Sequence, residues 1–261
     1  MLFRSLVSIP LTLGYLGEER YGLWVAISSV TTLLTFADLG LGYGVLNAVA
    51  EAKGGGDRRR AEVAISSATA LLSTIALALL VAAAVLGPLV PWADVFNVRT
   101  ATARAEAGPA VMAFVACLAI NLPLGIVVRV QYGLQEGFLA NAWSAIGSLV
   151  TLVALVAAIV AQAGLPVLVL ALVGGPAAAT LANGLVVFGR LHPDLRPALG
   201  RVRRPVAVQL VRVGVLFSIT QLALGVAYNS DVFVAARVIG PEAAAQYQRS
   251  EEHTSELQSR E

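Results

Sequence analysis

Several polar and charged side chains stand inside long apolar stretches of this 261-residue chain. If such stretches lie in a membrane, a charge near mid-bilayer costs about 2.5 kcal/mol or more, so it needs a partner or water. Hydrogen bonds between helices are the ordinary explanation for an amide such as Asn183, while carboxylates are harder to place. As candidates for lining a wet cavity we take Asp38, Asn47, Asn121, Arg129, Arg212, Gln221, Asn229 and Asp231.

Residues that usually carry catalysis or bind metals are scarce. The chain has one cysteine, Cys117, and two histidines, His192 and His253. None of them stands at metal-ligand spacing, and no helix carries His-Glu-x-x-His. Cys117 has no second cysteine to pair with and is expected to be a small core residue. We therefore expect no catalytic centre, no metal and no cofactor.

The composition explains why those polar groups matter. Hydrophobic residues make up 57% of the chain and charged residues 13%, and the mean hydropathy is +0.78. A soluble domain carries about 25% charged residues. Apolar runs of spanning length predict an all-α integral membrane protein. The predicted helices cover residues 6–16 (truncated), 21–50, 61–90, 108–132, 138–163, 166–188 and 206–238, and an eighth begins near 240.

Basic residues alternate between successive connections. The even connections and their flanks hold eleven Lys and Arg, whereas the odd ones hold four. Because loops rich in Lys and Arg stay in the cytoplasm, the even connections and the truncated N-terminus are predicted to be cytoplasmic. The eleven are Lys53, Arg58, Arg59, Arg60, Arg129, Arg190, Arg196, Arg201, Arg203, Arg204 and Arg212, and the four are Arg20, Arg99, Arg104 and Arg237.

The cluster at 53–60 could also suit nucleic acid or anionic lipid. In a short connection the positive-inside explanation is favoured, so we expect the bilayer as a partner and no nucleic acid.

The two ends differ in character from the rest. Residues 249–261 hold six charges and one aliphatic residue. Back-translated, 249–259 resemble a common short-read sequencing adapter, and 2–5 can be encoded by the end of its partner adapter. We therefore expect residues 1–5 and 249–261 to be adapter-derived and exclude them from fold reasoning. The natural part, about 6–248, would be an internal fragment that we expect to be inactive alone.

Two groups of residues resemble a known family. They are similar to motifs of the polysaccharide flippases, which belong to the multidrug/oligosaccharidyl-lipid/polysaccharide exporter superfamily. The matching residues are Leu16-Gly17, Tyr21-Gly22-Leu23-Trp24, Asp38-Leu39-Gly40-Leu41 and Asn47-Ala48 near the start, and Asn229-Ser230-Asp231, Val238-Ile239-Gly240 and Ala245-Gln246-Tyr247 near the end.

This resemblance implies a twelve- to fourteen-helix transporter built of two six-helix lobes. Residues 6–190 would be the first lobe, 191–205 a basic cytoplasmic linker, and 206–248 the seventh helix with the start of the eighth. Such proteins move a polyprenyl-diphosphate-linked oligosaccharide across the bacterial inner membrane by alternating access. The resemblance also implies a cationic cavity for the diphosphate and a coupling cation.

Three alternatives stay open. A cation-coupled multidrug exporter of the same superfamily would need acidic and aromatic cavity residues, and Asp38 suits it. An integral-membrane polysaccharide polymerase or ligase would need a catalytic external loop. The longest candidate, 91–107, has no histidine and only Asp94, Arg99, Arg104 and Glu106 as charges. A membrane scaffold without transport would leave Asp38 unexplained.

Overall fold

The chain folds into α-helices. The computed structural model describes residues 15–17, 19–27 and 40–238, and at 222 and 224–238 it describes the backbone alone. In these ranges there is no β-strand, so the predicted all-α class is confirmed. Residues 15–17 and 19–27 are helical, and the later helices are α2 (Leu41–Gly55), α3 (Arg58–Leu86), α4 (Trp92–Val95), α5 (Ala101–Gly133), α6 (Gly137–Val160), α7 (Leu165–Val186) and α8 (Arg204–Val238).

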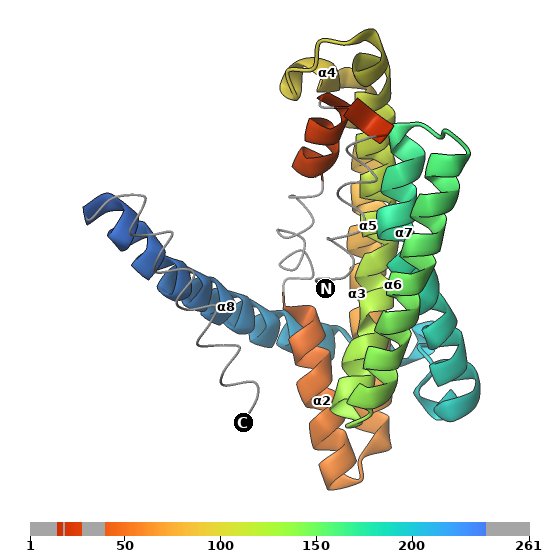
Figure 1. The fold of residues 1–261 in the computed structure, drawn as a ribbon. Helices are drawn as coiled ribbons and strands as arrows, with labels where there is room; N and C mark the ends of the chain where they lie inside the picture. Colours follow the sequence, from red (N-terminus) through yellow and green to blue (C-terminus); the bar gives the residue numbers. More distant parts are fainter. Residues whose placement is uncertain (1–14, 18, 28–39, 239–261) are drawn as a thin grey trace, which may run out of the picture. The chain divides into compact units, whose positions relative to one another are not determined.

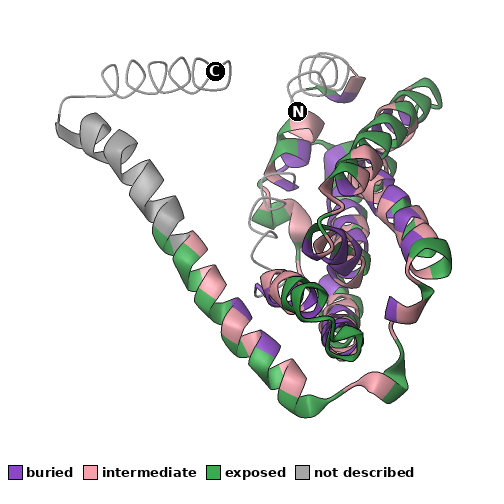
Figure 2. Ribbon diagram, turned by 90° about the horizontal axis from the view of Figure 1, so that it is seen from below, coloured by how far each residue is buried: buried purple, intermediate pink, exposed green. Residues whose placement is uncertain are grey.

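Four of the described helical stretches are long and apolar enough to cross a membrane: Arg58–Leu89, Ala101–Gly133, Gly137–Val160 and Leu165–Leu191. They contain α3, α5, α6 and α7, which lie side by side (Figure 1). Buried residues face the bundle interior and exposed ones face outward (Figure 2). The outward faces are apolar, since Leu77 is 62% and Val153 68% exposed. Such surfaces suit hydrocarbon rather than water.

Local sequence sets the helix ends. Gly56 closes α2 in the left-handed conformation (φ 71°) and donates its N–H to Ala52. Asp57 then caps α3, its Oδ1 accepting the N–H of Arg60 at 3.1 Å. Thr100 caps α5 in the same way through Ala103. The turn between α2 and α3 is therefore tight.

Two sequence predictions need correction. A single helix over 21–50 is wrong at Gly40, which takes a left-handed conformation (φ 69°) immediately before α2 begins. Glycine is the residue that tolerates this conformation, so the Gly-rich motif starts a new helix. The connection predicted over 91–107 is also largely helical. It contains α4, and α5 begins seven residues before the predicted start at 108 because Thr100 supplies a cap and an Ala-rich turn follows.

The motif near the start of the chain builds a hydrophobic core. Leu16, Leu23 and Trp24 are buried there, and Tyr21 packs against them. The same cluster includes residues of α5, α6 and α7. A second cluster joins α2 and α3 to the later part of α5 and to Leu210 of α8. The resemblance motif around 16–24 therefore has a packing role.

Residues of the even connections gather at one end of the lobe, which we name the basic end (Figure 1). There Arg58 pairs with Asp194 at 2.9 Å and His192 with Glu136 at 2.9 Å. Buried Ser66 and Ser67 of α3 accept the backbone N–H groups of Ala198 and Arg203 through their hydroxyl oxygens. The segment between α7 and α8 is thus fastened to α3.

Residues of the first, third and fifth connections gather at the other end, the opposite end (Figure 1). Arg20 makes a two-pronged ion pair with Glu106, at 2.8 and 3.0 Å. Glu19 accepts the backbone N–H groups of Arg99 and Thr100, the latter at 2.9 Å. These bonds tie 19–27 to the start of α5.

The hydrogen bonds that the Glu19 carboxylate accepts should depend on pH. Hydrogen bonds, first that with the Thr100 side chain, lower the pKa of Glu19 from its ordinary 4.5. A carboxyl with a lowered folded-state pKa stabilises fully above its unfolded value and loses that contribution as the pH falls through the folded value. We expect the Thr100 amide, after correction for intrinsic exchange, to be less protected at about pH 3 than at about pH 6. Hydrogen exchange measures this, and in Glu19→Gln the difference should vanish. Equal pH dependence in both proteins would contradict the assignment.

A close contact between α2 and α5 gives a second prediction. An added Cβ at Gly133 would lie 2.8 Å from the backbone oxygen of Leu46 and 2.8 Å from Cβ of Val49. Gly133→Ala should therefore destabilise the lobe by about 1–3 kcal/mol. Gly125→Ala on the same helix is the matched control, because an added Cβ there meets nothing within 4 Å. It should leave stability unchanged or raise it by up to about 1 kcal/mol. Thermal unfolding in detergent would rank the two, and equal melting temperatures would refute the contact.

Candidate functional site

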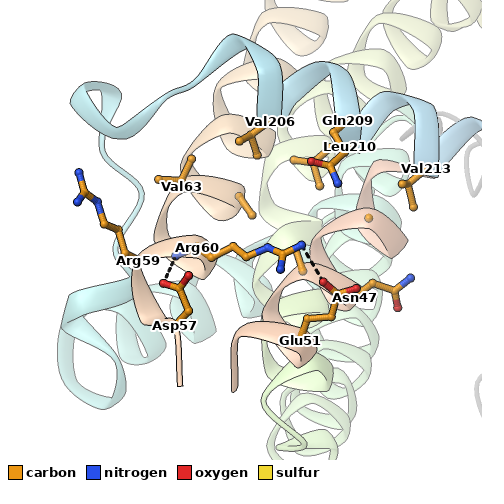
Figure 3. A pocket seen from close by; sticks show the side chains of 13 residues that line it. Asn47, Glu51, Asp57, Arg59, Arg60, Val63, Val206, Gln209, Leu210 and Val213 are labelled. Carbon is orange, nitrogen blue, oxygen red and sulfur yellow. Dashed lines mark hydrogen bonds and ion pairs between the residues drawn. The ribbon is translucent and has the colours of Figure 1, made fainter. Parts of the chain in front are cut away.

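A pocket of about 380 Å³ lies between α2, the start of α3 and the first turns of α8 (Figure 3). Its inner wall is apolar, formed by Val63, Val206, Leu210 and Val213. The chain comes especially close where α8 meets α2, since an added Cβ at Gly44 would lie 3.2 Å from Cδ2 of Leu210. The pocket is lined in addition by Gly44, Asn47, Ala48, Glu51, Asp57, Arg59, Arg60, Ala64 and Gln209.

Charged groups stand at the basic-end side of this pocket. Arg60 reaches across from α3 to Glu51 on α2, with Nη2 and Oε2 2.9 Å apart (Figure 3). Both side chains are more than half exposed, so the pair contributes little stability. With Arg59 and Asp57, the pocket carries two positive and two negative charges. The cationic cavity implied by the resemblance is therefore not formed by this pocket alone.

Asn47 is the sequence candidate that lines this pocket. It is half-buried, and its side chain makes no hydrogen bond within the part of the chain that the structure describes. Its amide can both donate and accept hydrogen bonds. A ligand with a polar head and an apolar body would match the lining.

Arg129 lies one turn before the end of α5, close to α2. Its guanidinium carbon sits 4.4 Å from the centre of the Tyr43 ring. No described carboxylate pairs with it. A cation over an aromatic face gains about 0.5–2 kcal/mol and keeps its N–H edge for an anion. Tyr43 and Asn47 are four residues apart on α2 and hence on one side of it.

Asn121 and Arg129 both lie on α5, but they contact different helices. The amide nitrogen of Asn121 donates to the carbonyl of Cys117 at 3.0 Å and to that of Val173 on α7 at 3.5 Å. Arg129 instead meets Tyr43 on α2. Eight residues turn a helix by about 80° beyond two full turns, which is enough to change the neighbour. Asn121 serves packing within the lobe in this structure.

The remaining cavity candidates take part in none of the contacts described above for Asn47, Asn121 and Arg129. Arg212 is exposed on α8, and Gln221 lies farther along it. The backbone of Asn229 and Asp231 belongs to α8, but their side chains and all of Asp38 lie outside the described residues. Contacts divide the chain into two units, Met1–Gly214 and Val215–Glu261, so the later part of α8 is described by itself.

Sequence reasoning missed one buried polar pair. Gln131 on α5 and Asn183 on α7 exchange two hydrogen bonds through their amides, at 3.1 and 2.8 Å, and both side chains are fully buried. The available signal was an amide in each of two apolar helices. Their reciprocal geometry needed the packed structure.

We expect this pair to show measurable coupling. Replacing Asn183 alone by Leu leaves a buried amide unpaired and should cost about 1–3 kcal/mol. The double variant with Gln131→Leu should recover part of that loss, since pairs inside membrane proteins couple by about 0.6–1.7 kcal/mol. Unfolding free energies of the wild type, both single variants and the double variant measure the coupling. Strict additivity would show that the two amides act independently.

Helices of spanning length with apolar outward faces are the features of a multi-spanning membrane protein, and the pocket between α2, α3 and α8 has both apolar and charged lining. The chain belongs to the polysaccharide biosynthesis protein family, whose model matches residues 3–259. That match includes parts of both ends, so their adapter origin stays a prediction.

Solved structures of transporters share the fold of this chain. The chain resembles a mutant MATE protein in a crystal structure (TM-score 0.74, 17% identity, 96% of this chain and 56% of that one). It also resembles the outward-facing conformation of a multidrug resistance MATE family transporter of the MOP superfamily (TM-score 0.72, 17% identity, 97% of this chain and 56% of that one). The chain thus spans a little over half the length of these transporters. Among curated proteins, none matches it significantly in sequence. Family and fold point to a transporter rather than an enzyme.

Proposed function

We propose that this chain is the first lobe and seventh helix of a flippase that moves a lipid-linked oligosaccharide across the bacterial inner membrane for surface polysaccharide biosynthesis. Membership of the polysaccharide biosynthesis family is the observation that carries the proposal. The length relative to the solved transporters supports a second lobe that completes the central cavity. In this arrangement the basic end faces the cytoplasm.

Arg129 supports the choice of an anionic substrate. It stands near the basic end with its guanidinium over Tyr43 and without a described carboxylate partner. The planar guanidinium suits the diphosphate of a polyprenyl-linked sugar, because it can offer parallel hydrogen bonds to phosphate oxygens. The apolar wall and polar rim of the α2–α3–α8 pocket suit the same amphiphilic molecule at its entry side. Asp38, Arg212, Gln221, Asn229 and Asp231 stay proposed cavity residues, with Asp38 and Asp231 as sites for a coupling cation.

The similarity to a multidrug resistance transporter supports a second candidate function, drug export. In a drug exporter the decisive groups would be carboxylates that bind a cation. The carboxylates of α3, α5, α6 and α7 make drug export the less favoured of the two functions. The two carboxylates of these helices, Glu62 and Glu106, lie near helix ends and pair with Arg201 and Arg20.

The proposal predicts a specific loss at Arg129. In the complete two-lobe protein, reconstituted in vesicles, Arg129→Ala should lower the rate of lipid-linked oligosaccharide flipping about tenfold, as expected for one lost charged hydrogen bond. Arg129→Lys should keep an intermediate rate because it preserves charge without the planar fork. Arg99→Ala at the opposite end is the matched control and should flip at the wild-type rate.

Two results would overturn the proposal. One is a wild-type protein that neither flips the lipid-linked oligosaccharide nor restores surface polysaccharide in a strain without its flippase. The other is efflux of a cationic dye that Asp38→Asn abolishes and Arg129→Ala leaves intact, which would establish the drug exporter.

A further inference from the structure

A second, more apolar groove runs along the bundle between α5 and α7 and ends beneath the segment that joins α7 to α8. It encloses about 500 Å³. Buried Ile126 and Val127 form its floor. Leu181, which is 50% exposed, and Leu185, which is 69% exposed, form one wall. The groove takes no part in the transport pocket described above, because the two share no lining residue.

The groove lies on helices of spanning length and its wall residues Leu181 and Leu185 are exposed, so hydrocarbon is the expected surrounding of its apolar part. In a membrane such a depression is filled by hydrocarbon, since nothing polar could stay there without a partner. A volume of several hundred Å³ with a mostly apolar lining and one charged group is typical of a small-molecule site. The shape and chemistry therefore favour an acyl chain.

The charged group is Arg196, at the basic-end mouth of the groove beside Phe188 and Pro197. Its side chain is exposed and forms no ion pair with a described residue. The backbone carbonyl of Arg196 accepts a hydrogen bond from Arg201 at 3.4 Å, and neighbouring Leu195 is buried.

The chain is also held in place by residues on both sides of Arg196. Asp194 pairs with Arg58 at 2.9 Å, and the N–H of Ala198 donates to Ser66 at 3.2 Å. Arg196 thus stands on an anchored turn, five residues beyond the stretch of spanning length that ends at Leu191, and it lines the apolar groove.

We propose that this groove binds an anionic phospholipid, with one acyl chain along α5 and α7 and the headgroup phosphate on Arg196. A basic group at the mouth of a groove between membrane helices is the arrangement that recognises anionic headgroups. Arginine adds a planar, two-pronged contact to phosphate oxygens. The site goes beyond the proposed transport of an oligosaccharide, and rests only on the chain being in a membrane.

Native mass spectrometry of the purified chain in detergent tests this directly. The probes are phosphatidylglycerol and phosphatidylcholine with identical acyl chains. The wild type should retain phosphatidylglycerol preferentially. Arg196→Gln should reduce that preference about fivefold, the factor that one arginine contributes near an anionic lipid surface. Arg190→Gln is the control, an exposed arginine of the same segment that does not line the groove. It should behave as the wild type.

A blocking variant tests the apolar part. Gly189 lines the groove, and an added Cβ there meets nothing within 4 Å, so Gly189→Trp fills the space without clashing at Cβ. It should lower retention of both lipids. Gly200→Trp is the matched control, since position 200 has similar open space and does not line the groove.

Several outcomes would overturn the inference. Equal retention of the two lipids by the wild type would do so, as would equal effects of Arg196→Gln and Arg190→Gln. A wild-type dimer that Gly189→Trp dissociates, without any lipid preference, would show that a second copy covers the groove. None of these results depends on flipping, so a failure here is distinguishable from a failure of the proposed function.

Discussion

The hydrocarbon of the bilayer excludes unpaired charge, and this constraint organises the whole lobe. Described ion pairs collect at its two ends, where Arg20 meets Glu106 and Arg58 meets Asp194. Buried polar side chains find partners inside the lobe, as Gln131 and Asn183 do in each other and Thr151 does in the carbonyl of Gly147. A helix in this fold is thus free to be apolar on every face, because its neighbours and the lipid are equally apolar. Arg129 differs from the paired charges at the two ends, because its partner is the aromatic ring of Tyr43.

The ends of the lobe differ in how they are held together. At the opposite end, carboxylates dominate the ties, with Glu19 and Glu106 receiving bonds from α5 and from Arg20. At the basic end, carboxylates also take part, as in the Arg58–Asp194 pair, and in addition hydroxyls of Ser66 and Ser67 receive backbone N–H groups from the segment before α8. Several arginines remain exposed there, among them Arg59, Arg190 and Arg196. The same end therefore holds the cations on which both proposals rest, Arg129 and Arg196.

Apolar run length and charge alternation were enough to predict α3, α5, α6, α7 and α8 to within a few residues at most ends. Those signals fail where a single backbone angle decides, as at Gly40, whose left-handed φ separates α2 from what precedes it. They also overlook helix outside the hydrocarbon, as in α4 and the first turns of α5. For the site, the sequence could nominate Asn47 and Arg129 as costly polar groups. It could not provide Tyr43 as the partner of Arg129 or the charge balance of the pocket, because both depend on how helices pack.

The contact between Gly44 and Leu210 has an evolutionary consequence. The second turn of α8 rests where α2 has no side chain, with 3.2 Å between an added Cβ and Cδ2 of Leu210. Positions 44 and 210 must therefore share one fixed volume. Among related sequences, a larger residue at 44 should coincide with a smaller one at 210. Such compensation would mark this point as the place where the first lobe dictates the start of the next helix.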